Sequence, residues 1–523
     1  MRCVRLINYK SGVKISKLKL KNFRSYRSVE ISFENLTAFI GRNDIGKSTI
    51  LEALDIFFNE GKGVVKLETN DLNTEAKGQD EQYIEITVCF NDLPTTITID
   101  SAYRTTLEDE FLLNKNKELE VIKRYSLKGL KEQVYLSAYH PSDQNCSDLY
   151  TKKSSDLKKI IKDAGITCEN NSVNAIMRSA IWEYYDASQH RKLRELDLAK
   201  EDGKNIWEKI KGFLPQYSLF QSDRKNSDND SEVQDPLKEA TKEIISSNNL
   251  EAQFNEIATE VTKKLWDVAN STLSKLKEMN PDIAEGLKVK IPEVKELKWA
   301  ELFKSVSIEG NDGIAMNKRG SGVRRLILLN FFRAKAEEKA SRDKRTLIYA
   351  IEEPETSQHN EHQKILIDAL KELGNKGHQI LLTTHSGYIV KQLDFNQLRL
   401  ARVDNNKQKE VVEVDVQALP YPSLNEINYI AFGDTNAEYH DELYGHLELQ
   451  GQLASFEQGK SKCAYIKCWH GKSTTENISL AKYIRHQIHH PENTQNRPYT
   501  SEELQQSIEE MREFLISING FSK

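Results

Sequence analysis

The sequence predicts an α/β fold in two separated lobes, with a mostly helical insertion and a short helical arm between them and an α-helical C-terminal module. Three observations predict this fold. The pattern "VEISFENLTAFI" ends in a buried strand, and a glycine-rich turn then leads into the helical pattern "STILEALDIFF". Apolar residues recur at three- and four-residue steps from Leu250 to Leu276, which predicts a long amphipathic helix between about 237 and 280. Strands and helices alternate again from 300 to 420. We therefore expect a first lobe at 1–100, an insertion at 101–299, a second lobe at 300–420 and a helical module at 421–523.

Length and composition restrict the class of protein. A chain of 523 residues with 38% apolar and 29% charged residues is large enough for several cooperating domains. Its longest apolar stretch, "LILLNFF", is far shorter than a membrane span, and its six scattered cysteines do not resemble a disulfide framework. We therefore expect a cytoplasmic protein without membrane contact. The net charge of -5 opposes attraction of the whole protein to nucleic acid, although Lys14 to Arg27 could form a local basic stripe.

The segment "GRNDIGKST", Gly41 to Thr49, satisfies the GxxxxGK[ST] pattern between a buried strand and an amphipathic helix. The glycines allow backbone N–H groups to surround phosphate oxygens, and the helix N-terminus adds its dipole. Lys47 would reach the β- and γ-phosphates, and Ser48 would be a Mg²⁺ ligand. The predicted binding residues of this loop are Gly41, Asn43, Gly46, Lys47, Ser48 and Thr49.

Two later strands carry polar residues at their ends. "RTLIYAIEEPE" places Glu352 and Glu353 at the carboxyl edge of the sheet, where ligands of α/β proteins bind. Glu352 would hold Mg²⁺ through water, and Glu353 would orient or deprotonate an attacking water. "HQILLTTHS" brings His385 to the same edge, where it would sense a γ-phosphate.

Between these motifs, "NKRGSGVRR" precedes an amphipathic helix that begins near Val323. This arrangement predicts a second helix N-terminus with free N–H groups at Ser321 and Gly322, without a lysine of its own. A simple helix cap is the alternative interpretation.

The order of these motifs, "NFRSY", "GRNDIGKST", "RGSG", "IYAIEEPE" and "LLTTHS", resembles the ABC-type ATPases of the SMC, Rad50 and RecF kind over residues 13–100 and 300–395. The resemblance implies an ABC-type P-loop ATPase head that binds ATP and Mg²⁺. It also implies a head-to-tail dimer, in which Ser321 and Gly322 would face Lys47 and Glu353 of a second chain. The signature reads RGSGVRR where LSGGQ is usual, and Glu352 stands where an aspartate is commoner. Both departures resemble the overcoming-lysogenization-defect branch.

The region after His385 shows no acid set of a Toprim nuclease, and long coiled-coil arms are absent from the sequence pattern. The layout therefore resembles stand-alone anti-phage defence ATPases such as the PtuA subunit of Septu and of related retron systems. This resemblance implies a homodimer or higher oligomer through ATP-sandwiched heads and a separately encoded nuclease of the HNH type. A reverse transcriptase complex is a further candidate partner. A RecF- or Rad50-like DNA repair ATPase is an alternative function.

The tail contains "ISLAKYIRHQIHHPENT", which we expect to form a helix that Pro491 ends, followed by a helix that starts at a Thr500 or Ser501 cap. The spacing of Arg485 and His490 resembles that of HEPN-domain ribonucleases. In such enzymes a histidine moves a proton at the RNA 2′-OH, and an arginine stabilises phosphate charge. This chain would then itself be an ATP-gated ribonuclease.

Two other interpretations of the tail stay open. Cys463 and Cys468, with His486 and His490, have spacings within the range of zinc sites. Alternatively, Ile484 and Ile488 form the apolar face of a capped helix that binds a partner, and the histidines are surface residues.

Overall fold

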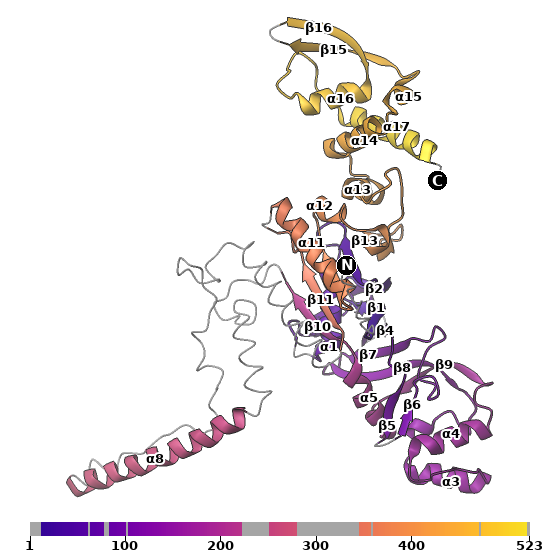
Figure 1. Cartoon of the computed structure of the whole chain (residues 1–523), viewed down its shortest axis with the longest axis vertical. Helices are drawn as coiled ribbons and strands as arrows, with labels where there is room; N and C mark the ends of the chain where they lie inside the picture. Colours follow the sequence, from indigo (N-terminus) through magenta and orange to yellow (C-terminus); the bar gives the residue numbers. More distant parts are fainter. Residues whose placement is uncertain are drawn as a thin grey trace, which may run out of the picture. The chain divides into compact units, whose positions relative to one another are not determined.

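The structure is a computed structural model that describes residues 12–60, 63–77, 83–100, 103–221, 250–279, 345–356, 359–469 and 472–519. The chain divides into two compact units, one formed by Met1–Ser222 with Ala336–Lys523 and the other by Asp223–Lys335. In the second unit the structure describes one element, the 30-residue helix α8 (Leu250–Met279). A helix is therefore present within the range predicted for the amphipathic arm (Figure 1).

The first sheet of the larger unit is antiparallel and has the order β2-β1-β4-β7-β8-β9. Alternating residues such as Leu18 and Leu20 in β1 are buried, as expected for a strand with one face on a core. The strands are β1 (Lys14–Phe23), β2 (Tyr26–Ser32), β4 (Tyr83–Asn91), β7 (Leu119–Ser126), β8 (Lys131–Pro141) and β9 (Arg191–Asp197).

The second sheet has the order β10-β11-β12-β3-β13-β14 and is parallel from β10 to β13. All five residues of β3 and all five of β12 are buried, as expected for strands covered on both faces. The strands are β10 (Gln216–Phe220), β11 (Leu347–Glu352), β12 (Gln379–Thr383), β3 (Leu36–Ile40), β13 (Leu398–Val403) and the antiparallel β14 (Lys409–Glu413).

One apolar core joins the two sheets. Helix α1 (Lys47–Asn59) contributes Leu54 and Phe57 to it, the first sheet contributes Leu18, and the second contributes Ile348. Among the described residues before 400, the other helices and short strands are α2 (Thr74–Lys77), β5 (Ile97–Asp100), β6 (Tyr103–Thr105), α3 (Ser154–Ala164), α4 (Asn174–Tyr184), α5 (Glu201–Phe213), α11 (Asn360–Asn375) and α12 (Gly387–Val390). The described residues also form the short 3₁₀ turns η1 (Thr69–Asp71), η2 (Leu149–Thr151) and η6 (Phe395–Gln397).

The C-terminal module has its own apolar core, which includes Tyr439, Leu443, Ile484 and Met511. Its helices are α13 (Leu424–Phe432), α14 (Ala437–Leu449), α15 (Leu453–Glu457), α16 (Leu480–His489) and α17 (Ser501–Asn519). Two tail helices agree with the prediction. Helix α16 ends just before Pro491, and the Thr500 hydroxyl accepts a hydrogen bond from the Glu503 N–H at the start of α17.

The module also contains a β-hairpin, which the prediction of a largely helical tail did not include. Strands β15 (Lys462–Trp469) and β16 (Lys472–Ser479) pair antiparallel as a separate two-stranded sheet. The β-branched and aromatic residues in "KCAYIKCW" and "KSTTENIS" favour strands, but few of them are buried, so the apolar alternation that marks a strand is weak.

The α/β fold with two sheets around a phosphate loop and a largely helical C-terminal region is confirmed. The predicted domain boundaries stay predictions. The structure adds that the sheet that begins at Lys14 continues to Asp197, inside the range assigned to the insertion. Within the described part of the chain, no helix is both long enough and apolar enough to span a membrane.

Candidate functional site

The glycine-rich loop connects β3 to α1, as the sequence predicts. Gly41 has φ +138°, and a Cβ placed there would lie 2.4 Å from the carbonyl oxygen of Ala401. Gly46 caps α1 with φ +110°, close to the hydroxyl of Tyr26. Only glycine has access to these conformations at low energetic cost, so the loop depends on both positions. The loop leads into the N-terminus of α1, and the N–H groups at a helix N-terminus favour an anion.

The side chain of Lys47 folds back over this loop. Its Nζ donates hydrogen bonds to the carbonyl oxygens of Gly41 at 2.9 Å and Arg42 at 2.8 Å, and the residue is 6% exposed. Burial lowers the pKa of Lys47 to about 8, against the opposing attraction of the Glu353 carboxylate. Lys47 therefore sits within electrostatic reach of Glu353, although about three hundred residues separate them in sequence.

The paired acids end β11, next to the end of β12. Glu352 pairs with Thr383 in the parallel register. Glu353 has φ +41°, a strained conformation for a residue with a side chain, and its N–H donates to both the carbonyl (3.0 Å) and the hydroxyl (3.1 Å) of Thr383. This turn directs the Glu353 carboxylate to His385, whose Nε2 lies 3.5 Å from Glu353 Oε1. The sheet thus brings Glu353 and His385 together as predicted.

The charge of His385 depends on the same neighbours. Burial lowers its pKa from the usual value, and Lys47 lowers it further, while Glu353 opposes them. The imidazole is therefore mainly neutral at pH 7, and its Nε2 is a hydrogen-bonding group at the edge of the sheet.

The sequence reasoning missed Glu355. Its Oε1 accepts hydrogen bonds from the hydroxyl of Thr384 at 2.9 Å and from the N–H of His385 at 2.7 Å. Burial raises the pKa of this carboxyl. Glu355 therefore fixes the segment that carries His385. It lies two residues after the acid pair in "EEPE", and this spacing was the available signal.

The second missed residue is Gln221, the first residue after β10. Strand β10 pairs in parallel with β11, so Gln221 follows the strand next to the one that carries the acid pair. Its Nε2 donates to Glu52 of α1 at 2.9 Å, and Glu52 also forms an ion pair with Arg24 of "NFRSY". The short run "YSLF" before a polar stretch indicates a strand. The sequence pattern from about 100 to 215 is mixed, so this strand was not predicted.

The remaining predicted residues divide into two groups. Asn43 and Ser48 are exposed and Thr49 is half-buried, all in the loop and first turn of α1, and Glu352 is half-buried at the end of β11. Ser321 and Gly322 lie outside the described residues.

A phosphate loop, acids and a histidine at the ends of neighbouring parallel strands define the class of P-loop nucleotide-hydrolysing proteins. A family model described as "AAA ATPase domain" matches residues 14–390. Because this range is well over half of the chain, the chain belongs to the AAA ATPase domain family. Membership implies nucleotide binding.

Several solved structures are similar to the chain at low identity. An SMC head domain from Thermotoga maritima has 14% identity and a TM-score of 0.30, covering 77% of this chain and 100% of that one. An Smc head domain with an extended coiled coil, bound to the C-terminal domain of ScpA and derived from Pyrococcus furiosus, has 15% identity and a TM-score of 0.34, covering 80% and 98%. An SmcHead bound to the C-winged helix domain of ScpA has 16% identity and a TM-score of 0.35, covering 77% and 98%. No curated protein matches the chain.

The two predicted ribonuclease residues contact different acidic side chains, and their catalytic role stays a prediction. Arg485 forms an ion pair with Asp441 of α14, and His489, one turn further along α16, contacts the same carboxylate at 2.6 Å. His490 lies just beyond the helix end, with its Nδ1 3.2 Å from Glu492. Each residue thus has a separate acidic neighbour, and Arg485 serves to hold α16 against α14.

The predicted zinc ligands are also separated. Cys463 and Cys468 are five residues apart on β15, and an odd spacing places side chains on opposite faces of a strand. Cys463 Sγ donates to the carbonyl of Ile478, and Cys468 Sγ to the side-chain oxygen of Asn493. Among the described residues, no group of three or more His, Cys, Asp or Glu side chains could hold a metal ion. The zinc interpretation is therefore wrong for these residues.

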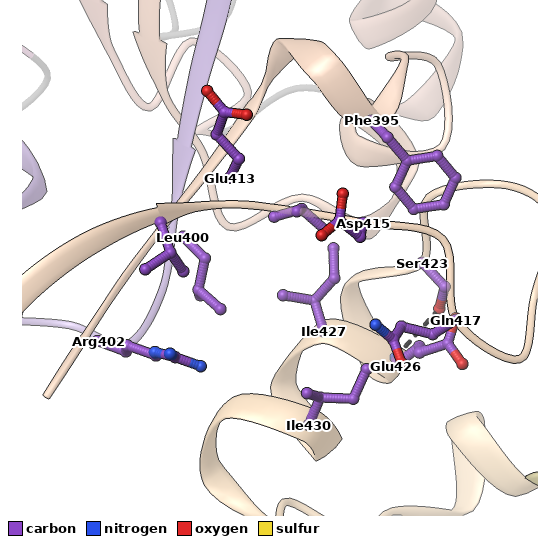
Figure 2. Close-up of a pocket in the computed structure, with 12 residues that line it drawn as sticks. Phe395, Leu400, Arg402, Glu413, Asp415, Gln417, Ser423, Glu426, Ile427 and Ile430 are labelled. Atoms are coloured by element: carbon purple, nitrogen blue, oxygen red, sulfur yellow. Dashed lines mark hydrogen bonds between the residues drawn. The ribbon is translucent and has the colours of Figure 1, made fainter. Parts of the chain in front are cut away.

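A cavity of about 260 Å³ lies where β13 and β14 face α13 (Figure 2). Ile427 and Ile430 of α13 and Leu400 of β13 supply apolar lining, and Arg402 is paired with Glu410 at 2.7 Å. None of the lining residues is a predicted nucleotide-site residue, so the cavity is distinct from the edge that carries Lys47 and Glu353.

Proposed function

We propose that this protein binds and hydrolyses ATP with Mg²⁺ at the edge formed by the loop before α1 and the ends of β11 and β12. The observation that carries the proposal is the convergence of Lys47, Glu353 and His385. Glu353 Oε1 lies 3.5 Å from His385 Nε2. The Glu353 carboxylate raises the pKa of Lys47, and the charge of Lys47 lowers the pKa of His385.

The roles follow from the chemistry of each side chain. Protonated Lys47 would exchange its two bonds to loop carbonyls for bonds to phosphate oxygens, which are stronger because both partners are charged. Glu353 would take the proton from the attacking water, and His385 Nε2 would contact the γ-phosphate. Gln221, which donates a hydrogen bond to Glu52 of α1, would contact the attacking water or the metal ion.

The residues present fit Mg²⁺. Ser48 is exposed in the first turn of α1, and Glu352 is the last residue of β11. Their side chains supply hard oxygen donors of the type that Mg²⁺ prefers. When bound, Mg²⁺ would neutralise charge on the phosphate oxygens.

We further propose that ATP joins two heads, with Ser321 and Gly322 of one chain completing the site of the other, and that the dimer controls a separately encoded nuclease in bacterial anti-phage defence. The motif order and the missing nuclease acids support this proposal. Two ion pairs also support a link from the nucleotide edge to the C-terminal module. Arg42 of the phosphate loop pairs with Asp434, and Lys391 of the α12 end pairs with Glu442 at 2.6 Å.

The central test compares Glu353→Gln and Lys47→Ala with the wild-type chain. We expect Glu353→Gln to abolish ATP turnover while it retains nucleotide binding, because only the proton acceptor is lost. Lys47→Ala should lose both. Glu361→Gln, an exposed acid at the start of α11, is the matched control and should turn over ATP at the wild-type rate. Hydrolysis at the wild-type rate in both Glu353→Gln and Lys47→Ala would show that the site is misassigned.

The defence role is tested separately by expressing the chain with a neighbouring nuclease gene and challenging the cells with phage. We expect protection that Glu353→Gln or Lys47→Ala removes. A chain that hydrolyses ATP but neither copurifies with a nuclease nor changes phage growth would refute the defence role and leave the ATPase assignment intact.

A further inference from the structure

The hairpin of β15 and β16 has two edges that differ in their protection. At the outer edge of β15, the loop after α16 supplies polar side chains. Asn496 accepts a hydrogen bond from the N–H of Ile466 at 2.7 Å, and Asn493 and Asn496 both donate to the carbonyl of Ile466. These side chains occupy the N–H and C=O of Ile466 that another strand would otherwise use, so they block the middle of this edge.

The outer edge of β16 is open. All six residues from Lys472 to Asn477 are exposed, and β15 is the only strand that pairs with β16 in the described part of the chain. In a strand paired on one side, alternate residues direct their N–H and C=O groups outward. An exposed edge of this kind is a template for pairing with another strand, and a two-stranded sheet alone is only marginally stable in water.

The sequence of this edge is complementary to itself. When two β16 strands run antiparallel with Thr474 opposite Thr474, Lys472 of each lies opposite Glu476 of the other, and Ser473 lies opposite Thr475. Opposite charges and hydroxyl pairs at facing positions both stabilise antiparallel sheets. Shifting the register by two residues removes the match, because Lys472 then faces Thr474 or Ile478.

The faces of the strand agree with this register. Within the hairpin, Lys472 pairs with Trp469, Thr474 with Lys467 and Glu476 with Tyr465, so Lys472, Thr474 and Glu476 share one face of the sheet. Glu476 already lies 3.8 Å from Lys467 of its own chain. In the paired arrangement each Glu476 would lie between two lysines, one from each copy.

We propose that β16 pairs with β16 of a second copy of this chain about a two-fold axis at Thr474, forming a four-stranded antiparallel sheet. The contact is isologous, as expected for a two-fold dimer. It needs no nucleotide and does not rest on the proposed function. The charges on the edge select this partner, because a strand of arbitrary sequence would leave Lys472 and Glu476 without opposite charges.

The first test measures association of the full chain by sedimentation velocity without nucleotide, over a range of protein concentrations. Lys472→Glu places two acids opposite each other at both ends of the contact, and Glu476→Lys places two lysines there. We expect each change to weaken association by about 10-fold or more, since two favourable pairs become repulsive. The double variant Lys472→Glu with Glu476→Lys restores the pairs and should associate like the wild-type chain. Lys462→Glu, an exposed charge on β15, is the matched control and should have no effect.

The second test reports the register through cysteine crosslinking in a Cys468→Ser background, which removes an exposed native thiol. Facing residues of antiparallel strands have Cα atoms about 4.5 to 5.5 Å apart, within the range of disulfides. Thr474→Cys should therefore form a disulfide-linked dimer under mild oxidation. Thr475→Cys should not, because its copies would be diagonal neighbours about 7 to 8 Å apart. Equal crosslinking of the two cysteines, or a wild-type chain that stays monomeric without nucleotide at all concentrations, would overturn the proposal. Pairing of β16 with a different protein, detected as crosslinking only when that protein is added, would also overturn it.

Discussion

The low pKa of Lys47 predicts that nucleotide affinity falls with pH in a range where most proteins are stable. Without nucleotide, burial holds this pKa at about 8. Phosphate oxygens favour the charged ammonium, so bound nucleotide raises the pKa. Below pH 8 both states carry the proton and affinity is constant. Above pH 8 the free protein must take up a proton to bind, so affinity decreases about 10-fold for each pH unit.

The magnitude follows from the fraction of protonated lysine. With a pKa of about 8, Lys47 is about 90% protonated at pH 7 and about 10% at pH 9. We therefore expect the dissociation constant for ATP to rise about 10-fold between these two pH values, equivalent to about 1.4 kcal/mol. Binding at pH 9 should take up about 0.9 proton per nucleotide, against about 0.1 at pH 7.

Isothermal titration calorimetry in buffers of different ionisation enthalpy measures both quantities. The control is Lys47→Arg, whose guanidinium stays charged across this range and should bind with a pH-independent affinity, whatever its absolute value. Equal affinities of the wild-type chain at pH 7 and pH 9 without proton uptake would refute the reasoning. A parallel loss of affinity in Lys47→Arg and the wild-type chain would also refute it.

Two further predictions concern stability. Gly41→Ala should abolish nucleotide binding and lower the melting temperature, because its Cβ would lie 2.4 Å from the carbonyl oxygen of Ala401. Gly129→Ala, at φ +85° in open space, is the control for backbone strain alone. It should lower the free energy of unfolding by about 1 to 2 kcal/mol. Arg178→Met should lower the free energy of unfolding by about 3 to 5 kcal/mol, measured by urea denaturation, because it leaves the buried carboxylate of Glu110 without its 3.1 Å ion pair. A loss smaller than 1 kcal/mol, or recovery of none of it in the double variant with Glu110→Gln, would contradict this account.

The strongest predictions from sequence were those with local physical causes. The phosphate loop needs glycines, a lysine and a helix start within nine residues, and all of these are visible in "GRNDIGKST". Glu353 and His385 were predictable because each ends an apolar run, and parallel strands place such ends at one edge. The hairpin was not predictable in the same way, because "KSTTEN" lacks the apolar alternation of a buried strand.

In the tail, a sequence pattern predicts chemistry but does not determine which neighbours its side chains contact. Arg485 and His490 have a spacing suited to a ribonuclease, but the spacing leaves open which neighbours the side chains meet. Packing of α16 against α14 places Asp441 beside Arg485 and His489. The same packing explains part of the basic composition of this helix.

The sequence by itself determined the α/β class, the phosphate loop and the order of its partner motifs, because these depend on hydrophobic periodicity and on residues close together in the chain. Only the tertiary structure decided which distant side chains meet. The parallel order of β10, β11, β12 and β3 brings Gln221, Glu353, His385 and Lys47 to one edge. The tertiary structure also places Glu355 where it accepts a hydrogen bond from the N–H of His385, and it leaves the edge of β16 open. Strand order and side-chain contacts arise from packing between segments hundreds of residues apart, and no local pattern encodes them.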